Sequence, residues 1–377
     1  MLLRSLVAAV LAGSAAFAQA SAARVARLDV NAISRPPIPP DRMELVTGAP
    51  LAVTNAEQRM AAVSLLSKAH ELSNVRAQPY DLKTSFTASG GLASDGSWML
   101  QDTSRARMYR WTANGPNYSA INLYPNAVAN GLYGSRTSSV LPLRLIQARS
   151  AIFFAIPNIG TQASVRTAKG ELNGAEQECV LLVIGAGNRS FTGGRNWEEA
   201  EYCMDSQSGL LTQYSPVPGL YVRYDYSAGL KFHNKSIANA FTISENEQIV
   251  LDAKTISVAD PPPATDAMFS AAGLSPLGVG RAMNPGFNWP IVMNAPGQPM
   301  PASATDAAIQ VVALHGNLTG DGQLTEIEIF ASTDSSLNQT AIDRAADIAR
   351  GRVPAQPGAT QQSSHMFLTF EFITAAH

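Results

Sequence analysis

Apolar and polar residues alternate along most of residues 80–258, a pattern that predicts short β-strands with one buried face. In residues 222–226, for example, valine and tyrosine alternate with arginine and aspartate. Turn-forming segments such as Asp95-Gly96 and residues 204–209 separate successive strands. Further strands are expected around the following residues: Leu82, Trp98, Tyr109, Ile121, Val165, Cys179, Glu199, Leu210, Ala240 and Ile249.

Two segments have helical spacing instead. Apolar residues recur at intervals of three from Met60 to Leu72, which predicts a helix that ends near Leu72. Thr54 and Glu57 have the spacing of a capping box at its start. A second helix is predicted over residues 141–153, where a proline is tolerated in the first turn.

The order of these elements indicates an α+β fold class. Residues 54–260 are expected to form a β-rich N-terminal domain, a curved antiparallel sheet or half-barrel with one or two packed helices. This order resembles the LolA/LppX-like lipoprotein-carrier fold, and the resemblance implies a half-barrel around apolar cargo. A closed barrel or a β-sandwich would give a similar alternation.

The first residues have the pattern of an export signal. Arg4 precedes an uncharged apolar run from Leu6 to Phe17, and small residues then allow cleavage after Ala18. The run is shorter than the roughly 20 residues of a membrane-spanning helix. We therefore predict a cleaved signal peptide at residues 1–18, a Pro-rich linker at residues 19–53 and a periplasmic or secreted protein. An uncleaved anchor, which alone would allow membrane contact, is the alternative.

Composition and cysteine usage agree with export. The chain has 27 basic and 29 acidic residues, so it has no electrostatic footprint for nucleic acid. Its two cysteines, Cys179 and Cys203, are expected to form a disulfide in an oxidising compartment. Closing this loop should stabilise the fold by about 3.5 kcal/mol in the chain-entropy model. The alternative, a redox-active pair, lacks the C-x-x-C spacing.

A second linker, rich in Pro and Gly, is predicted at residues 261–303, and residues 304–377 follow the order strand, turn, strand, helix, strand. The motifs are the acidic-Gly turn and second strand at residues 321–329, the alanine-rich helix at 341–346 and the aromatic strand at 367–372. These motifs resemble the TonB C-terminal domain family. The family's aromatic residues after the helix are missing. The resemblance implies a small α+β domain that binds a partner's strand or a peptide at its sheet edge.

The turn in this C-terminal region also matches part of the sequence pattern of a calcium-binding loop. Asn317, Thr319, Asp321, Gly322 and Glu328 match ligand and turn positions of an EF-hand loop. The flanking residues alternate with period two, however, and so predict strands in place of the required helices. A hairpin turn with the glycine at positive φ is the preferred interpretation.

Other candidate chemistry is weaker. The Gly185-Ala186-Gly187 segment lacks a following helix that would bind phosphate, and no G-x-S-x-G motif is present. No two histidines have the local spacing of a metal site. The five histidines are His70, His233, His315, His365 and His377.

Acidic and aromatic residues of the predicted strands have simple structural interpretations. Glu198, Glu199 and Glu201 are interpreted as a solvated strand face, with an acid/base pair as the alternative. Core packing is the preferred interpretation of four aromatic residues, with the lining of an apolar cavity as the alternative. These residues are Trp98, Trp111, Tyr221 and Tyr224.

The sequence thus predicts a non-enzymatic envelope protein with no catalytic residues, no cofactor and no metal. Its β-domain would bind or carry an apolar ligand, and its TonB C-terminal-like domain would contact an envelope protein or peptide. Two alternatives stay open: a secreted enzyme with dispersed catalytic residues, and a membrane-anchored TonB-type energy transducer for outer-membrane transport.

Overall fold

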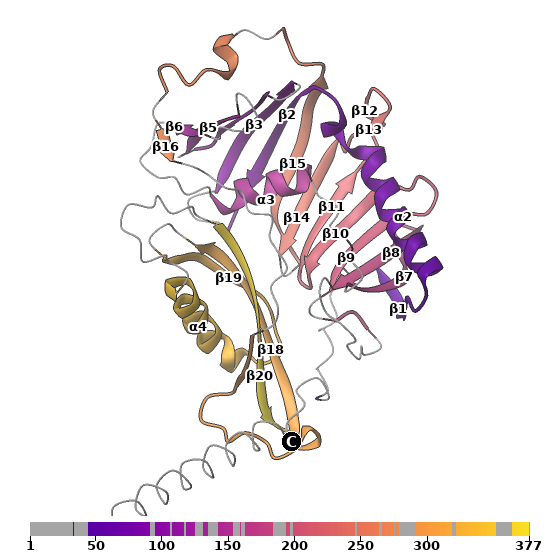
Figure 1. The fold of residues 1–377 in the computed structure, drawn as a ribbon, viewed down its shortest axis with the longest axis vertical. Coiled ribbons are helices and arrows are strands. Elements are labelled where there is room, and N and C mark those ends of the chain that lie inside the picture. The colour runs from indigo at the N-terminus through magenta and orange to yellow at the C-terminus, as the bar shows by residue number, and fades with distance from the viewer. Residues whose placement is uncertain are drawn as a thin grey trace, which may run out of the picture.

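The computed structural model contains a large curved sheet, a small sheet and the helices packed on them (Figure 1). It describes residue 33 and residues 44–376, except for the following: 91–94, 106–107, 117, 125–130, 135–141, 154–158, 160–162, 184–193, 197–198, 246, 264–265, 275, 279–290, 319–321 and 352–363. The predicted signal peptide lies outside the described residues.

In the described part of the chain, fourteen strands form one open sheet, and each pairs antiparallel with its neighbours. In spatial order they are β1 (Val46–Ala52), β7 (Ser164–Leu172), β8 (Ala175–Val183), β9 (Ala200–Asp205), β10 (Leu211–Val217), β11 (Leu220–Asp225), β14 (Ala240–Glu245), β15 (Gln248–Ala259), β2 (Tyr80–Ala88), β3 (Gly96–Arg105), β4 (Met108–Asn114), β5 (Ser119–Tyr124), β6 (Gly131–Gly134) and β16 (Pro276–Gly278). A two-stranded ribbon, β12 (Lys231–Phe232) with β13 (Lys235–Ser236), is separate. The predicted β-rich, open curved architecture is confirmed.

Helices α2 (Ala56–Ser73) and α3 (Leu143–Ile152) pack on the same face of the large sheet, which we call the helix face. The alternating burial predicted from the sequence is present, as in β2, where every second residue is buried. Side chains of both helices and of strands across the sheet form one continuous core. Trp98 and Trp111 belong to this core, and Trp98 stacks on Phe86.

The capping box of α2 begins one residue later than Thr54. Asn55 is the N-cap and accepts a hydrogen bond from the backbone N–H of Gln58 at 2.9 Å. The Gln58 side chain accepts the Thr54 N–H in return. Asparagine is a strong N-cap, and glutamine three residues later supplies the reciprocal acceptor, so the predicted pair of Thr54 and Glu57 is wrong by one position.

Helix α3 is buried on nearly all sides, although it carries two arginines and a glutamine. Each of these side chains has a polar partner. Arg149 donates to Asp102 of β3 at 3.1 Å, and its guanidinium lies 4.3 Å from the centre of the Trp111 ring. Arg144 pairs with Glu245 of β14 at 2.7 Å. These pairs attach α3 to the large sheet, because an unpaired buried charge would strongly destabilise it.

The small sheet has the order β17 (Ile291–Asn294), β20 (Ser364–Ala375), β18 (Ala307–Leu318) and β19 (Leu324–Ser332). Helix α4 (Asn338–Gly351) connects β19 to β20 and packs on one face. The predicted order of strand, turn, strand, helix and strand is present, and β17 adds a parallel edge strand that the sequence analysis missed.

The opposite face of the small sheet is covered as well. Ile33 is buried there against Ile309, Val311 and Ile373. Ala313 belongs to the core of the large sheet, so the two sheets are packed together. Strands β1, β16 and β17 all lie in stretches predicted as linkers, so part of each stretch is paired in a sheet.

Among the described residues, no helix combines the length and apolar character needed to cross a membrane.

Candidate functional site

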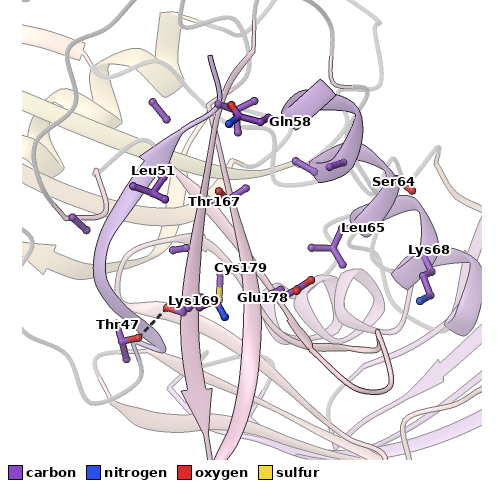
Figure 2. A pocket seen from close by; sticks show the side chains of 16 residues that line it. Thr47, Leu51, Gln58, Ser64, Leu65, Lys68, Thr167, Lys169, Glu178 and Cys179 are labelled. Atoms are coloured by element: carbon purple, nitrogen blue, oxygen red, sulfur yellow. Dashed lines mark hydrogen bonds between the residues drawn. The ribbon is translucent and has the colours of Figure 1, made fainter. Parts of the chain in front are cut away.

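An open groove lies on the helix face, between α2 and strands β1, β7 and β8 (Figure 2). Its volume is about 860 Å³, within the range of roughly 300–1,000 Å³ that is usual for small-molecule sites. Much of its lining is small and apolar. The apolar lining includes Ala49, Ala52, Val53, Ala61, Ala62 and Leu65.

The sequence of α2 explains why space remains beside it. The helix packs on the sheet through Ala62, Leu66 and Ala69, and two of these three side chains are methyl groups. Alanines at 61 and 62 therefore keep the start of α2 thin where it passes the edge strand β1. Larger side chains at these positions would fill the groove.

The rim of the groove is polar and also exposes one large apolar side chain. Lys68 of α2, with Lys169 of β7 and Glu178 of β8, lines the opening. Lys169 forms an ion pair with Glu176, and the hydrogen bond of that pair raises the pKa of the lysine. Leu51 of β1 is 71% exposed beside the groove. An apolar chain could lie along the floor with its polar end at this rim.

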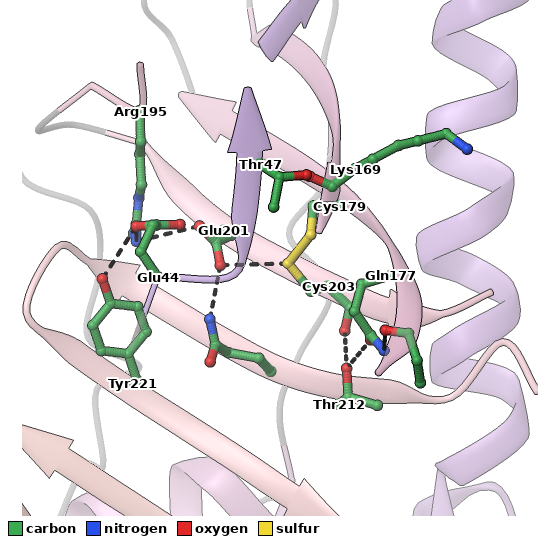
Figure 3. Close-up of a disulfide and its surroundings, with 12 residues drawn as sticks. Glu44, Thr47, Lys169, Gln177, Cys179, Arg195, Glu201, Cys203, Thr212 and Tyr221 are labelled. Carbon is green, nitrogen blue, oxygen red and sulfur yellow. Dashed lines mark hydrogen bonds and ion pairs between the residues drawn. A yellow bond between two sulfur atoms is a disulfide. The ribbon is translucent and has the colours of Figure 1, made fainter. Parts of the chain in front are cut away.

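The expected disulfide lies at the same end of the sheet. Cys179 of β8 and Cys203 of β9 face each other in register and are joined by an S–S bond (Figure 3). Cys179 also lines the groove. The disulfide therefore holds together two strands next to the groove.

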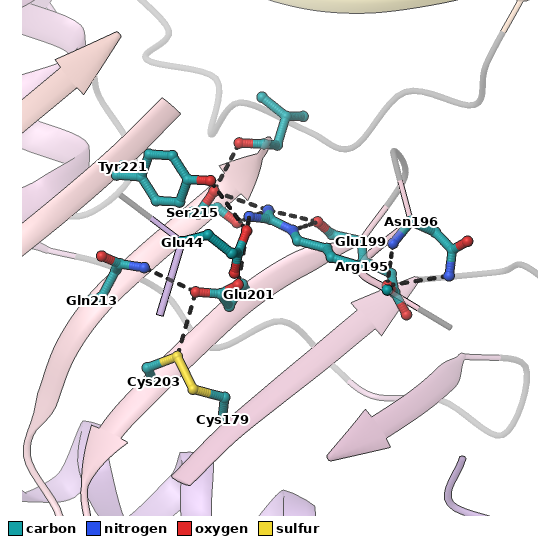
Figure 4. Close-up of polar contacts among 12 residues, drawn as sticks. Glu44, Cys179, Arg195, Asn196, Glu199, Glu201, Cys203, Gln213, Ser215 and Tyr221 are labelled. Carbon is teal, nitrogen blue, oxygen red and sulfur yellow. Dashed lines mark hydrogen bonds and ion pairs between the residues drawn. A yellow bond between two sulfur atoms is a disulfide. The ribbon is translucent and has the colours of Figure 1, made fainter. Parts of the chain in front are cut away.

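A buried charged cluster covers the opposite face of the sheet beside this disulfide (Figure 4). Arg195 lies 3.5 Å from Glu44 and 3.6 Å from Glu201, and Arg166 donates to Glu199 at 2.7 and 2.5 Å. We call these five residues the disulfide-side cluster. Uncharged partners complete it: Gln213 donates to Glu201 at 2.9 Å, and Tyr221 donates to Glu44 at 3.2 Å.

Two carboxyl groups of this cluster share a proton. Burial and the neighbouring Glu44 charge raise the pKa of Glu201 well above its usual value. Burial also opposes ionisation of Glu44, but a hydrogen bond from Glu201 and the charge of Arg195 hold its pKa below the usual value. Glu201 is thus the protonated member and Glu44 the ionised one.

The interpretation of Glu199 and Glu201 as a solvated face is wrong. They are 1% and 0% exposed, because this face of the sheet is covered and not open to water. Each carboxyl group is tolerated there because a guanidinium or an amide satisfies it. Glu198 lies outside the described residues, as does the Gly185-Ala186-Gly187 segment.

A second buried polar cluster joins the two sheets, and no pattern in the sequence indicated it. Arg144 donates to Glu245 at 2.7 Å and to Glu328 at 3.2 Å, while Gln147 donates to Glu245 at 2.8 Å. His315 Nε2 lies 3.2 Å from Glu245 Oε1 and 3.4 Å from Glu328 Oε2. We call these five residues the inter-sheet cluster.

The ionisation of this cluster is uneven. Burial opposes ionisation of Glu245, but the hydrogen bond from His315 and its charge hold the pKa of Glu245 well below the usual value. Burial and the Glu245 charge raise the pKa of Glu328. Burial disfavours the charged form of His315, but hydrogen bonds to both carboxylates raise the pKa of this histidine.

The structure separates Glu328 from the predicted calcium loop and directs it to this cluster. The flanks of the loop are the paired strands β18 and β19, not helices, and Gly322 has the expected positive φ of 83°. Thr319 and Asp321 lie outside the described residues. A hairpin therefore describes the flanks of this segment better than an EF-hand.

Comparison with protein-family models gave no match, and neither did comparison with curated proteins. Among solved structures, the chain is similar to a LolA superfamily protein from Nitrosomonas europaea (TM-score 0.36, 11% identity, covering 55% of this chain and 97% of that one). It is also similar to a putative outer membrane lipoprotein-sorting protein domain from Vibrio parahaemolyticus (TM-score 0.34, 8% identity, 57% and 97% covered). A third similar structure is MucB in complex with MucA(peri) (TM-score 0.25, 10% identity, 68% and 74% covered).

The first of these neighbours belongs to the superfamily that the N-terminal element order resembles. Similarities this weak carry no functional conclusion. The resemblance of residues 304–375 to the TonB C-terminal domain family stays a prediction.

Proposed function

We propose that this protein is an exported bacterial envelope protein that binds an apolar ligand, such as the acyl chain of a lipid or lipoprotein, in the groove beside α2. The observation that supports the proposal is the groove itself, with a volume of about 860 Å³, an apolar lining and an opening beside lysine side chains. An acyl chain gains free energy from leaving water at about 0.8 kcal/mol for each buried CH₂.

The disulfide supports the location in the envelope, because such bonds persist in oxidising compartments. Periplasmic placement and a protein-contact role for residues 304–375 are parts of the same proposal. We assign no catalytic role to the Glu44 and Glu201 pair, because the Glu201 side chain is fully buried and cannot reach a substrate.

Lipid binding can be tested on full-length protein that has been exported and purified without detergent. Native mass spectrometry should reveal a co-purified lipid. The fluorescent fatty acid cis-parinaric acid should bind to delipidated protein and become brighter as it leaves water. Ala61→Trp places an indole in the groove and should weaken this binding by at least about 10-fold, or about 1.4 kcal/mol.

Ser67→Trp is the matched control. Ser67 is an exposed residue of the same helix that does not line the groove, so its substitution should leave binding of the probe unchanged. Wild-type protein that carries no lipid and does not bind the probe would contradict the proposal. Equal weakening by both tryptophans would also count against this groove as the site.

A further inference from the structure

The inter-sheet cluster brings together three side chains that can each bind a metal. Glu245 comes from the end of β14 in the large sheet, and His315 and Glu328 come from β18 and β19 in the small sheet. One candidate ligand atom from each residue lies within 4.8 Å of the other two. Glu245 and His315 are 4% and 0% exposed, and Glu328 is 29% exposed.

We propose that Glu245, His315 and Glu328 form a binding site for a divalent transition-metal ion such as Zn²⁺. Imidazole and carboxylate are ligands that zinc accepts, at bond lengths of about 2.0–2.2 Å. Tetrahedral bonds of that length place neighbouring ligand atoms about 3.3–3.6 Å apart. The two distances from His315 Nε2 to the carboxylate oxygens, 3.2 and 3.4 Å, are close to this spacing.

The charges of the cluster favour a cation. Two carboxylates face a single guanidinium, that of Arg144, so a neutral imidazole leaves one negative charge uncompensated. A proton can supply the missing charge, and so can a metal ion. Binding of the metal should therefore release a proton from Glu328 or His315.

A second observation concerns the other oxygen of the Glu245 carboxylate. The Oε2 atom of Glu245 is buried and accepts no hydrogen bond from the described residues, although Oε1 of the same carboxylate accepts from Arg144 and Gln147. Buried carboxylate oxygens normally have a partner. A metal ion held by this carboxylate would satisfy the second oxygen.

The surroundings of the three ligands suit a metal site with an open coordination position. Arg144 and Gln147 hold the Glu245 carboxylate in place, as outer-shell partners of metal ligands commonly do. Glu328 is the partly exposed member, so the cluster has a side from which water could bind as a fourth ligand. The ion would join the two sheets, because its ligands come from both.

The test uses untagged full-length protein, freed of metal with a chelator and then dialysed. Titration with ZnCl₂ in a calorimeter should show one binding site per chain, and the measured heat should differ between buffers, because the buffer takes up the protons that zinc releases. His315→Gln and Glu328→Gln should each weaken zinc binding by at least about 10-fold, since even outer-shell changes cost about 10–100-fold. Addition of Co²⁺ should give visible absorption bands that both substitutions reduce.

His233→Gln is the matched control, because His233 is exposed and pairs with Asp260 away from the cluster. This variant should bind zinc as the wild type does. Absence of zinc binding to the wild type would overturn the proposal, as would binding that survives in Glu328→Gln and His315→Gln. If His315→Gln does not fold, Glu328→Gln and the Co²⁺ spectrum decide the matter. Neither outcome bears on the lipid groove, which lies beside α2 at the β1 edge of the large sheet, whereas Glu245 belongs to the central strand β14.

Discussion

The two buried polar clusters differ in where their members come from and in whether a histidine joins the carboxyl groups. The disulfide-side cluster pairs Arg166 and Arg195 with three glutamates on one face of the large sheet. The inter-sheet cluster pairs Arg144 with two glutamates and adds His315 of another sheet. Each cluster has one more carboxyl group than it has arginines.

The two clusters compensate the charge of their extra carboxyl group differently. In the disulfide-side cluster a proton stays on Glu201, which is 0% exposed, and none of the described histidines forms an ion pair with its carboxyl groups. In the inter-sheet cluster an imidazole lies between the carboxylates, and Glu328 is partly open to water. A set of carboxyl groups without a histidine holds a proton for structural reasons, whereas a set that includes a histidine can exchange it for a cation.

The largest expected effect tests whether the disulfide-side cluster depends on its charge balance. Arg166→Met should destabilise the protein by about 3–5 kcal/mol, because the buried Glu199 charge loses its partner. Unfolding in urea, followed by circular dichroism, measures the change. Lys169→Met of the neighbouring exposed pair is the control and should change stability little. A loss below about 1 kcal/mol for Arg166→Met would show that Glu199 finds another partner or takes up a proton.

The second effect concerns the covalent link beside the cluster. Replacing both Cys179 and Cys203 by alanine should destabilise the protein by about 3.5 kcal/mol, since the bond closes a loop with a sequence separation of 24. Urea unfolding again measures the loss. The inter-sheet cluster has no such link, so zinc binding should persist in this variant under native conditions. Loss of zinc binding by the folded variant would mean that the two clusters are coupled.

The third effect, the smallest for a single step of one pH unit, tests the proton on Glu201. Its raised pKa means that the folded protein keeps a proton which the unfolded chain loses near pH 4.5, so stability falls as the pH rises above that value. Glu201→Gln imitates the protonated form and should remove this contribution, which is at most about 1.4 kcal/mol per pH unit. Urea unfolding of both proteins at pH 5, 6, 7 and 8 gives the difference. Parallel pH dependences would show that Glu201 is ionised in the folded state.

Local patterns predicted much of the fold. Alternation identified most strands of both sheets, but not β1, β16 and β17, and helical spacing identified α2, α3 and α4, because burial of one face acts on each segment separately. Boundaries were less certain, as the one-residue error at Asn55 shows. The disulfide was predictable because the chain has only one pair of cysteines.

The candidate sites were not predictable in the same way. The sequence predicts that Glu199 and Glu201 are exposed. They are buried because other parts of the chain cover their face of the large sheet. The groove depends on where α2 lies relative to β1, and this strand belongs to residues 19–53, which the sequence predicts to be a linker. The alternation of apolar and polar residues assigns each residue to a face of its strand, but it does not indicate which element covers that face.

The sequence by itself determined most of the strands and the helices, which face of each is apolar, and that the cysteines can pair. Only the tertiary structure decided the strand order, the groove and the meeting of Arg144 with Glu328, which are 184 positions apart. The physical reason is that secondary structure follows from contacts within a few residues, whereas a site needs side chains that the chain brings together only when its sheets close and pack.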